Sequence, residues 1–122
     1  MSTKPEGKLW KKLKDFTPSI TWIRIENTVS FGTPDLLGYN KNQTYFTIEM
    51  KVSKSKKLAI SPFQISYCYT HPVKHFILAQ AHDPRSIKLY EGTQIAMLVE
   101  QGLSLSPIRE GWDVVRDYLY RL

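Results

Sequence analysis

The chain has 122 residues, of which 42% are hydrophobic, and 17 Lys and Arg against 11 Asp and Glu give a net charge of +6. This length suits one domain, and the apolar content with 3 Trp, 7 Tyr and 5 Phe excludes a disordered chain. No apolar run could span a membrane, the polar stretch after Met1 excludes a secretory signal, and a lone Cys68 excludes an internal disulfide. We therefore expect a soluble protein of the reducing cytoplasm.

The positive charge favours a polyanionic partner, with nucleic acid first and a membrane surface second. The alternative is charge that serves solubility alone. Neither reading can be chosen from charge without a site beside it.

Residues 4–16 are predicted to form a helix, because Leu9, Trp10 and Leu13 recur at helical spacing on one face. Pro5 follows Thr3 and Lys4 at the first turn, where proline is tolerated. The opposite face is basic and contains Lys8, Lys11 and Lys12.

Three strands are predicted next, over residues 20–26, 35–39 and 45–52, from their alternation and their β-branched and aromatic residues. The turn residues "NKNQ" at 40–43 join the second and third strands as a hairpin. A lysine-rich loop follows at 53–57.

A helix is predicted from Ser61 to about Thr70, with Ser61 as its cap and Pro62 at its first position. The remaining predicted elements are strands at 75–81 and 86–91 and helices at 94–101 and 111–122. The order α-β-β-β-α-β-β-α-α predicts a single α/β domain whose mixed sheet is flanked by helices, with a C-terminal helical extension from about residue 93.

The third strand alternates between two faces. Phe46, Ile48, Met50 and Val52 form one set, which is expected to face a helix-covered core, so Glu49 and Lys51 are neighbours on the other face. A carboxylate can hold a divalent cation, and an adjacent ammonium can orient water or neutralise phosphate charge. A simple ion pair on a solvated strand is the alternative, and the commoner one for an isolated Glu-x-Lys.

Asp35 begins the neighbouring strand, just after Gly32 and Pro34 set the entry of the chain. In a hairpin, Asp35 and Glu49 can project to the same side from adjacent strands. Two carboxylates with waters and substrate phosphate oxygens suit Mg²⁺, or Mn²⁺ in its place. The alternative for Asp35 is an ordinary turn residue after proline.

Glu6 and Gln64 each have two readings. Glu6 lies at the end of the apolar stripe of the first helix and could face a site, but Thr3-x-x-Glu6 is also a capping box. Gln64 could reach Lys51, a water or a ligand, but Ser61-x-x-Gln64 is a capping box too.

Other chemistries find little support in the sequence. No glycine-rich phosphate loop or dinucleotide fingerprint is present, so we expect no nucleotide cofactor. His71, His75 and His82 with Cys68 do not have the spacing of a zinc site, because Pro72 interrupts the first pair and no second cysteine exists.

The stretches "GTPDLLGY", "FTIEMKV" and "SPFQ" together resemble the PD-(D/E)xK nuclease superfamily. Pro34-Asp35 matches the first half of its motif and Glu49-Met50-Lys51 the second. The arrangement is most similar to archaeal-type Holliday junction resolvases and to small virus-type replication–repair nucleases. It covers roughly the first two-thirds of the chain, from Glu6 to about Ala81.

The resemblance implies a restriction-endonuclease-like core and a Mg²⁺-dependent DNA endonuclease that hydrolyses phosphodiester bonds. Asp35, Glu49 and the Met50 carbonyl would be metal ligands, with Glu6 as a further ligand, direct or through water. Lys51 would position the attacking water, and Gln64 matches the helix glutamine of the replication–repair type. That type has a Val-Arg-Arg sequence near the glutamine, which is absent here because residues 65–67 read Ile-Ser-Tyr.

The resemblance also implies branched DNA as the substrate and a homodimer that cuts two strands. The face of the last helix from Trp112 to Leu122 is either a dimer surface or packed on its own sheet. The alternatives are a nicking, repair, replication or restriction-type nuclease, or a non-catalytic basic DNA-binding protein. The lysines expected to contact DNA are Lys54, Lys56 and Lys57 after the site strand and Lys8, Lys11 and Lys12 on the first helix.

Overall fold

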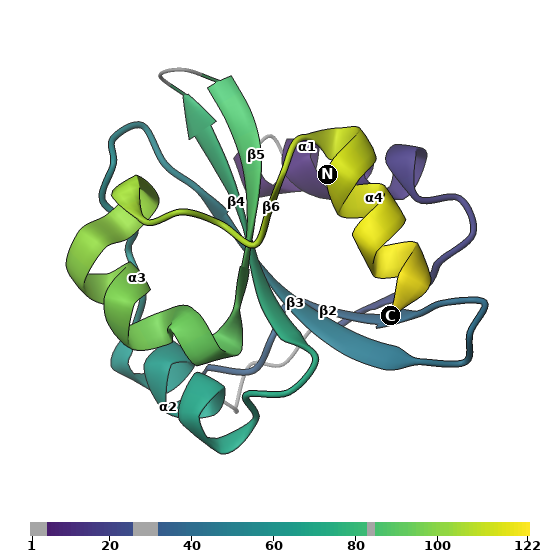
Figure 1. Ribbon diagram of the computed structural model, residues 1–122, viewed down its shortest axis with the longest axis horizontal. Coiled ribbons are helices and arrows are strands. Elements are labelled where there is room, and N and C mark those ends of the chain that lie inside the picture. The colour runs from purple at the N-terminus through teal and green to yellow at the C-terminus, as the bar shows by residue number, and fades with distance from the viewer. Residues whose placement is uncertain (1–4, 26–31, 83–84) are drawn as a thin grey trace.

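The computed structural model describes residues 5–25, 32–82 and 85–122, and it shows a mixed α/β fold in three layers. A six-stranded sheet forms the middle layer, with α2 and α3 against one face and α1 and α4 against the other (Figure 1). The expected mixed sheet flanked by helices is therefore confirmed. No helix in the described part of the chain is long and apolar enough to cross a membrane.

The strands follow one another across the sheet in chain order. The pairs β2–β3, β1–β2, β4–β5 and β5–β6 are antiparallel, while β3 and β4 run parallel and are connected through α2. Parallel neighbours need such a crossover, whereas the short turn at 40–44 permits a hairpin of β2 and β3. β5 and β6 are joined by the longer segment 92–108, which contains a helix. The strands are β1 (Thr21–Arg24), β2 (Leu36–Tyr39), β3 (Tyr45–Val52), β4 (His75–His82), β5 (Arg85–Glu91) and β6 (Arg109–Glu110).

The four helices begin and end close to where the sequence predicts. The Pro at the first position of α2 and its Ser61 cap are both confirmed. The helix predicted at 94–101 is confirmed as α3, with a short 3₁₀ turn on each side that was not predicted. The helices are α1 (Pro5–Phe16), α2 (Pro62–Thr70), η1 (Gly92–Gln94), α3 (Ile95–Gln101), η2 (Gly102–Ser104) and α4 (Trp112–Arg121).

The two faces of the sheet have different cores. Under α1 and α4, Leu9 and Leu13 pack with Phe46, Ile48 and other apolar residues of the sheet. Under α2 and α3, a smaller cluster contains Cys68, Ile77, Ala79 and Tyr90. Phe46, Ile48 and Met50 are buried in the first core and Val52 packs against it, so the predicted alternation of the third strand is confirmed.

The C-terminal region is joined to this sheet and core. The two residues of β6, which the sequence analysis does not predict, extend the sheet beside β5. Val115 and Leu119 of α4 are buried in the same core as α1, and Trp112 and Leu122 pack against it. This apolar face therefore packs on its own sheet, and it is not available as a dimer surface.

Three sequence predictions concern residues outside the described part of the chain: the start of the first helix at residue 4, the capping role of Thr3 and the extension of the first strand to residue 26. The described part of the first strand is shorter than predicted, at Thr21–Arg24. Pro5 begins α1 as described, and Leu9 and Leu13 face the core while Lys8, Lys11 and Lys12 are exposed.

Candidate active site

Most of the residues that the sequence analysis assigns to a site meet in one pocket beside β3. The pocket has a volume of about 320 Å³ and lies where β1, β2, β3 and the first turns of α1 and α2 come together. Its lining residues are Glu6, Gly7, Arg24, Asp35, Glu49, Met50, Lys51 and Gln64.

Asp35 lies opposite Glu49 because of the β2–β3 register. Leu36 pairs with Ile48 in this antiparallel hairpin, so the preceding Asp35 falls across from Glu49. The Asp35 carboxylate accepts a hydrogen bond of 2.8 Å from the Met50 N–H, which holds it at the edge of β3. The predicted approach of the two carboxylates is therefore confirmed.

Gly32 explains how the chain enters this position. It has a positive φ of 78°, and an added Cβ would collide with the backbone carbonyl of Phe63 in the first turn of α2. Only glycine fits such a close approach at this backbone conformation. The segment before Asp35 can therefore pass directly over the start of α2.

Glu49 is a buried carboxylic acid, only 6% exposed. Burial raises the pKa of Glu49 to about 9, and the negative charge of Asp35 adds to this rise, while the Lys51 ammonium opposes it. The net value of about 9 also includes smaller contributions that raise it, from a hydrogen bond with Asp35 and from the charge of Glu6. Without a cation, two facing carboxyl groups in low dielectric retain a proton at neutral pH.

Lys51 is fixed by several acceptors on the same face of β3. Its ammonium donates to the Gln64 side-chain oxygen at 2.8 Å and to the Ala59 carbonyl at 2.7 Å. The distance from Lys51 Nζ to Glu49 Oε2 is 4.0 Å. Its side chain is 15% exposed, so the charge is held at the wall of the pocket and not in bulk water.

Gln64 performs both of the roles that the sequence left open. Its main-chain N–H donates to the Ser61 hydroxyl, and its side-chain oxygen accepts from the Ser61 N–H, each at 3.1 Å, which completes a capping box. The same oxygen accepts from Lys51, and the side-chain amide donates to Glu49 Oε2 at 2.8 Å. The helix start therefore connects directly to both charged residues of β3.

Glu6 lies at the wall of the pocket in the first turn of α1 and is exposed. It affects the Glu49 pKa, although less than Asp35 does. Its capping role depends on Thr3, which is outside the described residues. The structure therefore places Glu6 beside the carboxylate pair as a peripheral third acid.

Arg24 lines the pocket, and the sequence analysis did not identify it. It pairs with Leu36 at the end of β1, next to Asp35. Pairing the first two predicted strands in antiparallel register would have placed Arg24 beside Asp35. Its guanidinium adds a cation that can face a phosphate, because Arg offers a planar set of donors.

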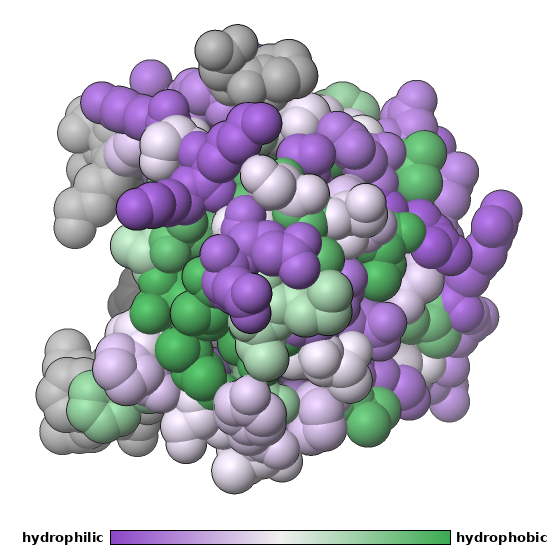
Figure 2. Space-filling model, turned by 60° about the vertical axis from the view of Figure 1, so that its left-hand side comes forward, coloured by the Kyte–Doolittle hydropathy of each residue, from purple (hydrophilic) through white to green (hydrophobic). Residues whose placement is uncertain are grey.

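The six lysines that were expected to contact DNA lie outside this pocket. None of them is among the described residues that line it. Lys8, Lys11 and Lys12 are exposed on α1, and the loop between β3 and α2 presents the other three. In Figure 2, hydrophilic side chains gather across the upper part of the side that bears α2 and α3, above a hydrophobic patch.

The pocket offers only a small set of oxygen ligands to a divalent cation. Among the described residues, no group of three or more His, Cys, Asp or Glu side chains could hold a metal ion. Asp35 and Glu49 do lie opposite each other, and the Met50 N–H points at Asp35. The N–H and carbonyl of one strand residue point to the same side, which directs the Met50 carbonyl toward the β2 edge. Such a set leaves positions for water and phosphate oxygens, which is how Mg²⁺ is usually bound.

Cys68 lies under the site on the α2 side. Burial raises the pKa of its thiol to about 11, and the charge of Glu49 raises it further. A protonated thiol is a poor nucleophile and a poor metal ligand. The carboxylates and the lysine are thus the groups that can act chemically here.

No protein-family model, curated protein or solved structure matches the chain.

Proposed function

We propose that the protein is a Mg²⁺-dependent endonuclease of the PD-(D/E)xK type, with a restriction-endonuclease-like core. The observation that supports this most strongly is the set of Asp35, Glu49, Lys51 and Gln64 in one pocket. Gln64 bonds both Glu49 and Lys51 at 2.8 Å, and Asp35 accepts from the Met50 N–H at 2.8 Å. A surface ion pair would not need a buried acid of raised pKa, which costs folding stability.

In this proposal Asp35, Glu49 and the Met50 carbonyl hold the cation. The bound Mg²⁺ would supply charge to stabilise the phosphate and would lower the pKa of a bound water. Lys51 donates a hydrogen bond to the attacking water or to a phosphate oxygen, and Gln64 keeps the lysine and Glu49 in place. Glu6 orients water at the edge of the site, and Arg24 faces the phosphate.

The proposed substrate is branched DNA, most specifically a four-way junction, cut in the cytoplasm by a homodimer. Two chains are needed because a junction is resolved by two cuts. Since the apolar face of α4 is used within the chain, the dimer must form through another surface.

The test is a cleavage assay with a labelled four-way junction, a matched duplex and a single strand, in Mg²⁺, in Mn²⁺ and with chelator. We expect metal-dependent cuts that disappear in Asp35→Asn and Glu49→Gln, with symmetric paired cuts in the junction. Single nicks, or equal cutting of all three substrates, would reject the resolvase but keep the nuclease. Binding without cleavage in either metal would show a basic DNA-binding protein and end the nuclease proposal.

A further inference from the structure

A second pocket lies at the far end of β3 and is lined by basic residues. Its volume is about 290 Å³, and it is open toward the loop between β3 and α2. Ala81 and Leu103 form its apolar part, and Lys54, Lys56, Lys88 and His82 surround it. No Asp or Glu is among the described residues that line it, in contrast to the carboxylate pocket.

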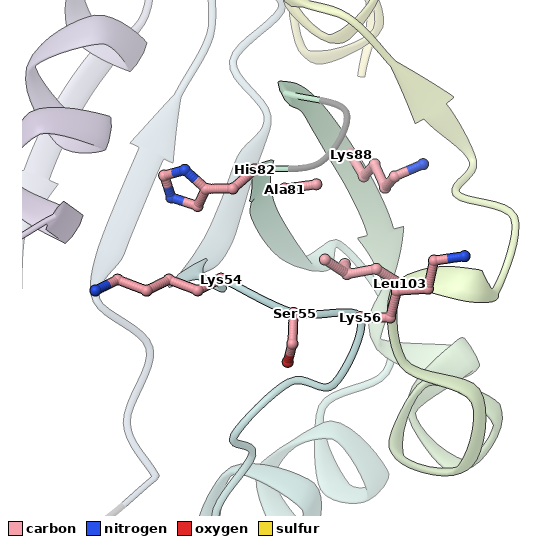
Figure 3. Close-up of a pocket in the computed structure, with 7 residues that line it drawn as sticks. All are labelled: Lys54, Ser55, Lys56, Ala81, His82, Lys88 and Leu103. Atoms are coloured by element: carbon pink, nitrogen blue, oxygen red, sulfur yellow. The ribbon is translucent and has the colours of Figure 1, made fainter.

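The basic residues surround the pocket from both sides. In Figure 3, Lys54 and His82 extend to one side of Ala81, and Lys56 and Lys88 extend to the other. Lys88 Nζ lies 3.3 Å from Glu110 Oε2 of β6, and its side chain is 18% exposed. This single acid offsets only one of the three ammonium charges, so the pocket keeps a positive charge.

Hydrogen bonds within and beyond the loop brace the segment that presents Lys54 and Lys56. The Ser53 hydroxyl bonds the carbonyls of Ser55 and Lys57 at 2.7 and 2.6 Å, and it accepts from the Ser55 N–H at 3.2 Å. The Leu103 N–H donates to the Lys56 carbonyl at 2.6 Å, which ties the loop to η2. A fixed loop presents its ammonium groups at lower entropic cost than a mobile one.

Gly102 lies next to the hydrogen bond that joins the loop to η2. Its φ is +60°, and an added Cβ would collide with the Lys56 carbonyl. The α3–η2 junction is therefore shaped to the loop. The hydrogen bond from Leu103 and the close approach of Gly102 together hold the Lys56 backbone at the pocket.

The two pockets lie on the same face of the sheet. Lys51 pairs with Ala79 on β4, and Ala79 pairs with Lys88 on β5, so the three residues form one row across adjacent strands. Adjacent strands are about 4.8 Å apart, which puts the Lys51 and Lys88 backbones about 10 Å apart. Ala79 between them is fully buried in the core under α2 and α3, so this row gives the spacing of the two backbones, and a DNA strand that reaches both pockets passes outside that core.

We infer that this pocket holds a backbone phosphate of the same DNA strand that is cut at the carboxylate site, a few nucleotides from the cut. The identity of the ligand rests on the proposed function. A strand advances about 3.4 Å along the helix axis per nucleotide, so about 10 Å corresponds to about three nucleotides. Ammonium groups around an open pocket, with no acid among its described lining residues, recognise phosphate charge without reading sequence.

The test combines protein variants with single neutral methylphosphonates placed along a bound oligonucleotide, with chelator present so that no cutting occurs. The variant is Lys54→Gln with Lys56→Gln. The matched control is Lys41→Gln with Lys74→Gln, which removes the same charge from two exposed lysines next to the opposite ends of β3 and β4.

We expect the Lys54/Lys56 variant to raise Kd about tenfold and to lower the salt slope by about one for each lost contact. A methylphosphonate at one position should weaken DNA binding by the wild type and by the control. It should have little further effect on DNA binding by the Lys54/Lys56 variant. Such non-additivity identifies the phosphate that the pocket holds. The inference is wrong if a methylphosphonate at every position weakens DNA binding by the variant and by the wild type equally. It is also wrong if the variant binds DNA with the same Kd and salt slope as the control.

Failure of the inference and failure of the proposed function give different results. A wild type that cuts DNA but shows no coupled phosphate rejects the phosphate pocket and leaves the nuclease. A wild type that shows the coupled phosphate but cuts nothing in Mg²⁺ or Mn²⁺ rejects the nuclease and supports the pocket as a nucleic-acid contact.

Discussion

The two faces of the eight-residue strand β3 differ in what they bury: one buries apolar side chains, and the other buries a carboxyl group. On one face Ile48 is fully buried in a dry core between the sheet and the helices α1 and α4. On the other, Glu49 is almost as buried but is placed against a second carboxylate. The first face supplies stability, whereas the burial of Glu49 beside Asp35 on the second face costs stability.

The largest expected effect is on chemistry. Glu49→Gln should lower the rate of metal-dependent cleavage by about 1000-fold or more, because a metal ligand is lost and transition-state charge is no longer stabilised. The measurement is single-turnover cleavage of a labelled junction. Glu100→Gln, at an exposed position of α3, is the control and should keep full activity. Equal activity in the two variants would mean that the carboxylate pair has no catalytic role.

Substitutions on the core face of β3 should change the free energy of unfolding. Ile48→Ala should lower the free energy of unfolding by about 2–5 kcal/mol, because it removes buried surface and leaves a cavity. Denaturant unfolding measures this, with Ile23→Ala as the control. Ile23 is 54% exposed, so its truncation should change stability by no more than about 0.5 kcal/mol. Similar losses in both variants would contradict the division between the two faces.

His75 extends the polar face onto β4 and makes stability depend on pH. Its Nδ1 lies 2.8 Å from the Thr47 hydroxyl, and burial lowers the pKa of His75 to about 4. The unfolded chain binds a proton near pH 6.5, so stability is full above this pH and falls as pH drops toward 4. The loss attributable to His75 should be about 2–3 kcal/mol.

The readout is the difference in unfolding free energy between the wild type and His75→Gln, measured from pH 7 to pH 4. Glu49 is present in both proteins, so its contribution to the pH dependence cancels in this difference. That contribution has the opposite sign, because the raised pKa of Glu49 makes stability increase as pH falls. A constant difference across this range would show that His75 is not held neutral.

The smallest effect separates two glutamines with the same local motif. Gln64 and Gln94 each accept from the N–H of the residue three positions earlier, but only Gln64 also contacts Glu49 and Lys51. Alanine at either position should cost about 1 kcal/mol of stability. Only Gln64→Ala should also slow cleavage, by about tenfold, because only it releases charged groups of the site. A similar rate in both variants would reduce Gln64 to a helix cap.

Much of the fold could be predicted because local patterns and tertiary contacts agree. Alternation along residues 45–52 placed Glu49 and Lys51 on one face, and the hairpin at 40–43 set the register that brings Asp35 opposite Glu49. The capping box at Ser61 fixed the start of α2, and so the position of Gln64.

The rest depends on contacts between distant segments. The short strand β6 has only two residues and no pattern of its own, and it forms because β5 offers an edge. Arg24 enters the site through the pairing of β1 with β2, and Lys88 joins Lys54 and Lys56 through two further strands. The lysine loop therefore belongs to a separate pocket, whereas the sequence suggested a rim of the carboxylate site.

Thermal unfolding of the wild type and Glu49→Gln, with and without Mn²⁺, tests most directly whether the polar face of β3 gives up stability to bind metal. The Glu49 pKa of about 9 means that its stability cost is absent below about pH 4.5 and grows as pH rises toward 9. At pH 7 without metal, Glu49→Gln should therefore be more stable than the wild type by about 1–3 kcal/mol. Mn²⁺ should raise the Tm of the wild type and leave that of the variant unchanged. A variant that is less stable than the wild type, together with a wild-type Tm that ignores Mn²⁺, would contradict the account.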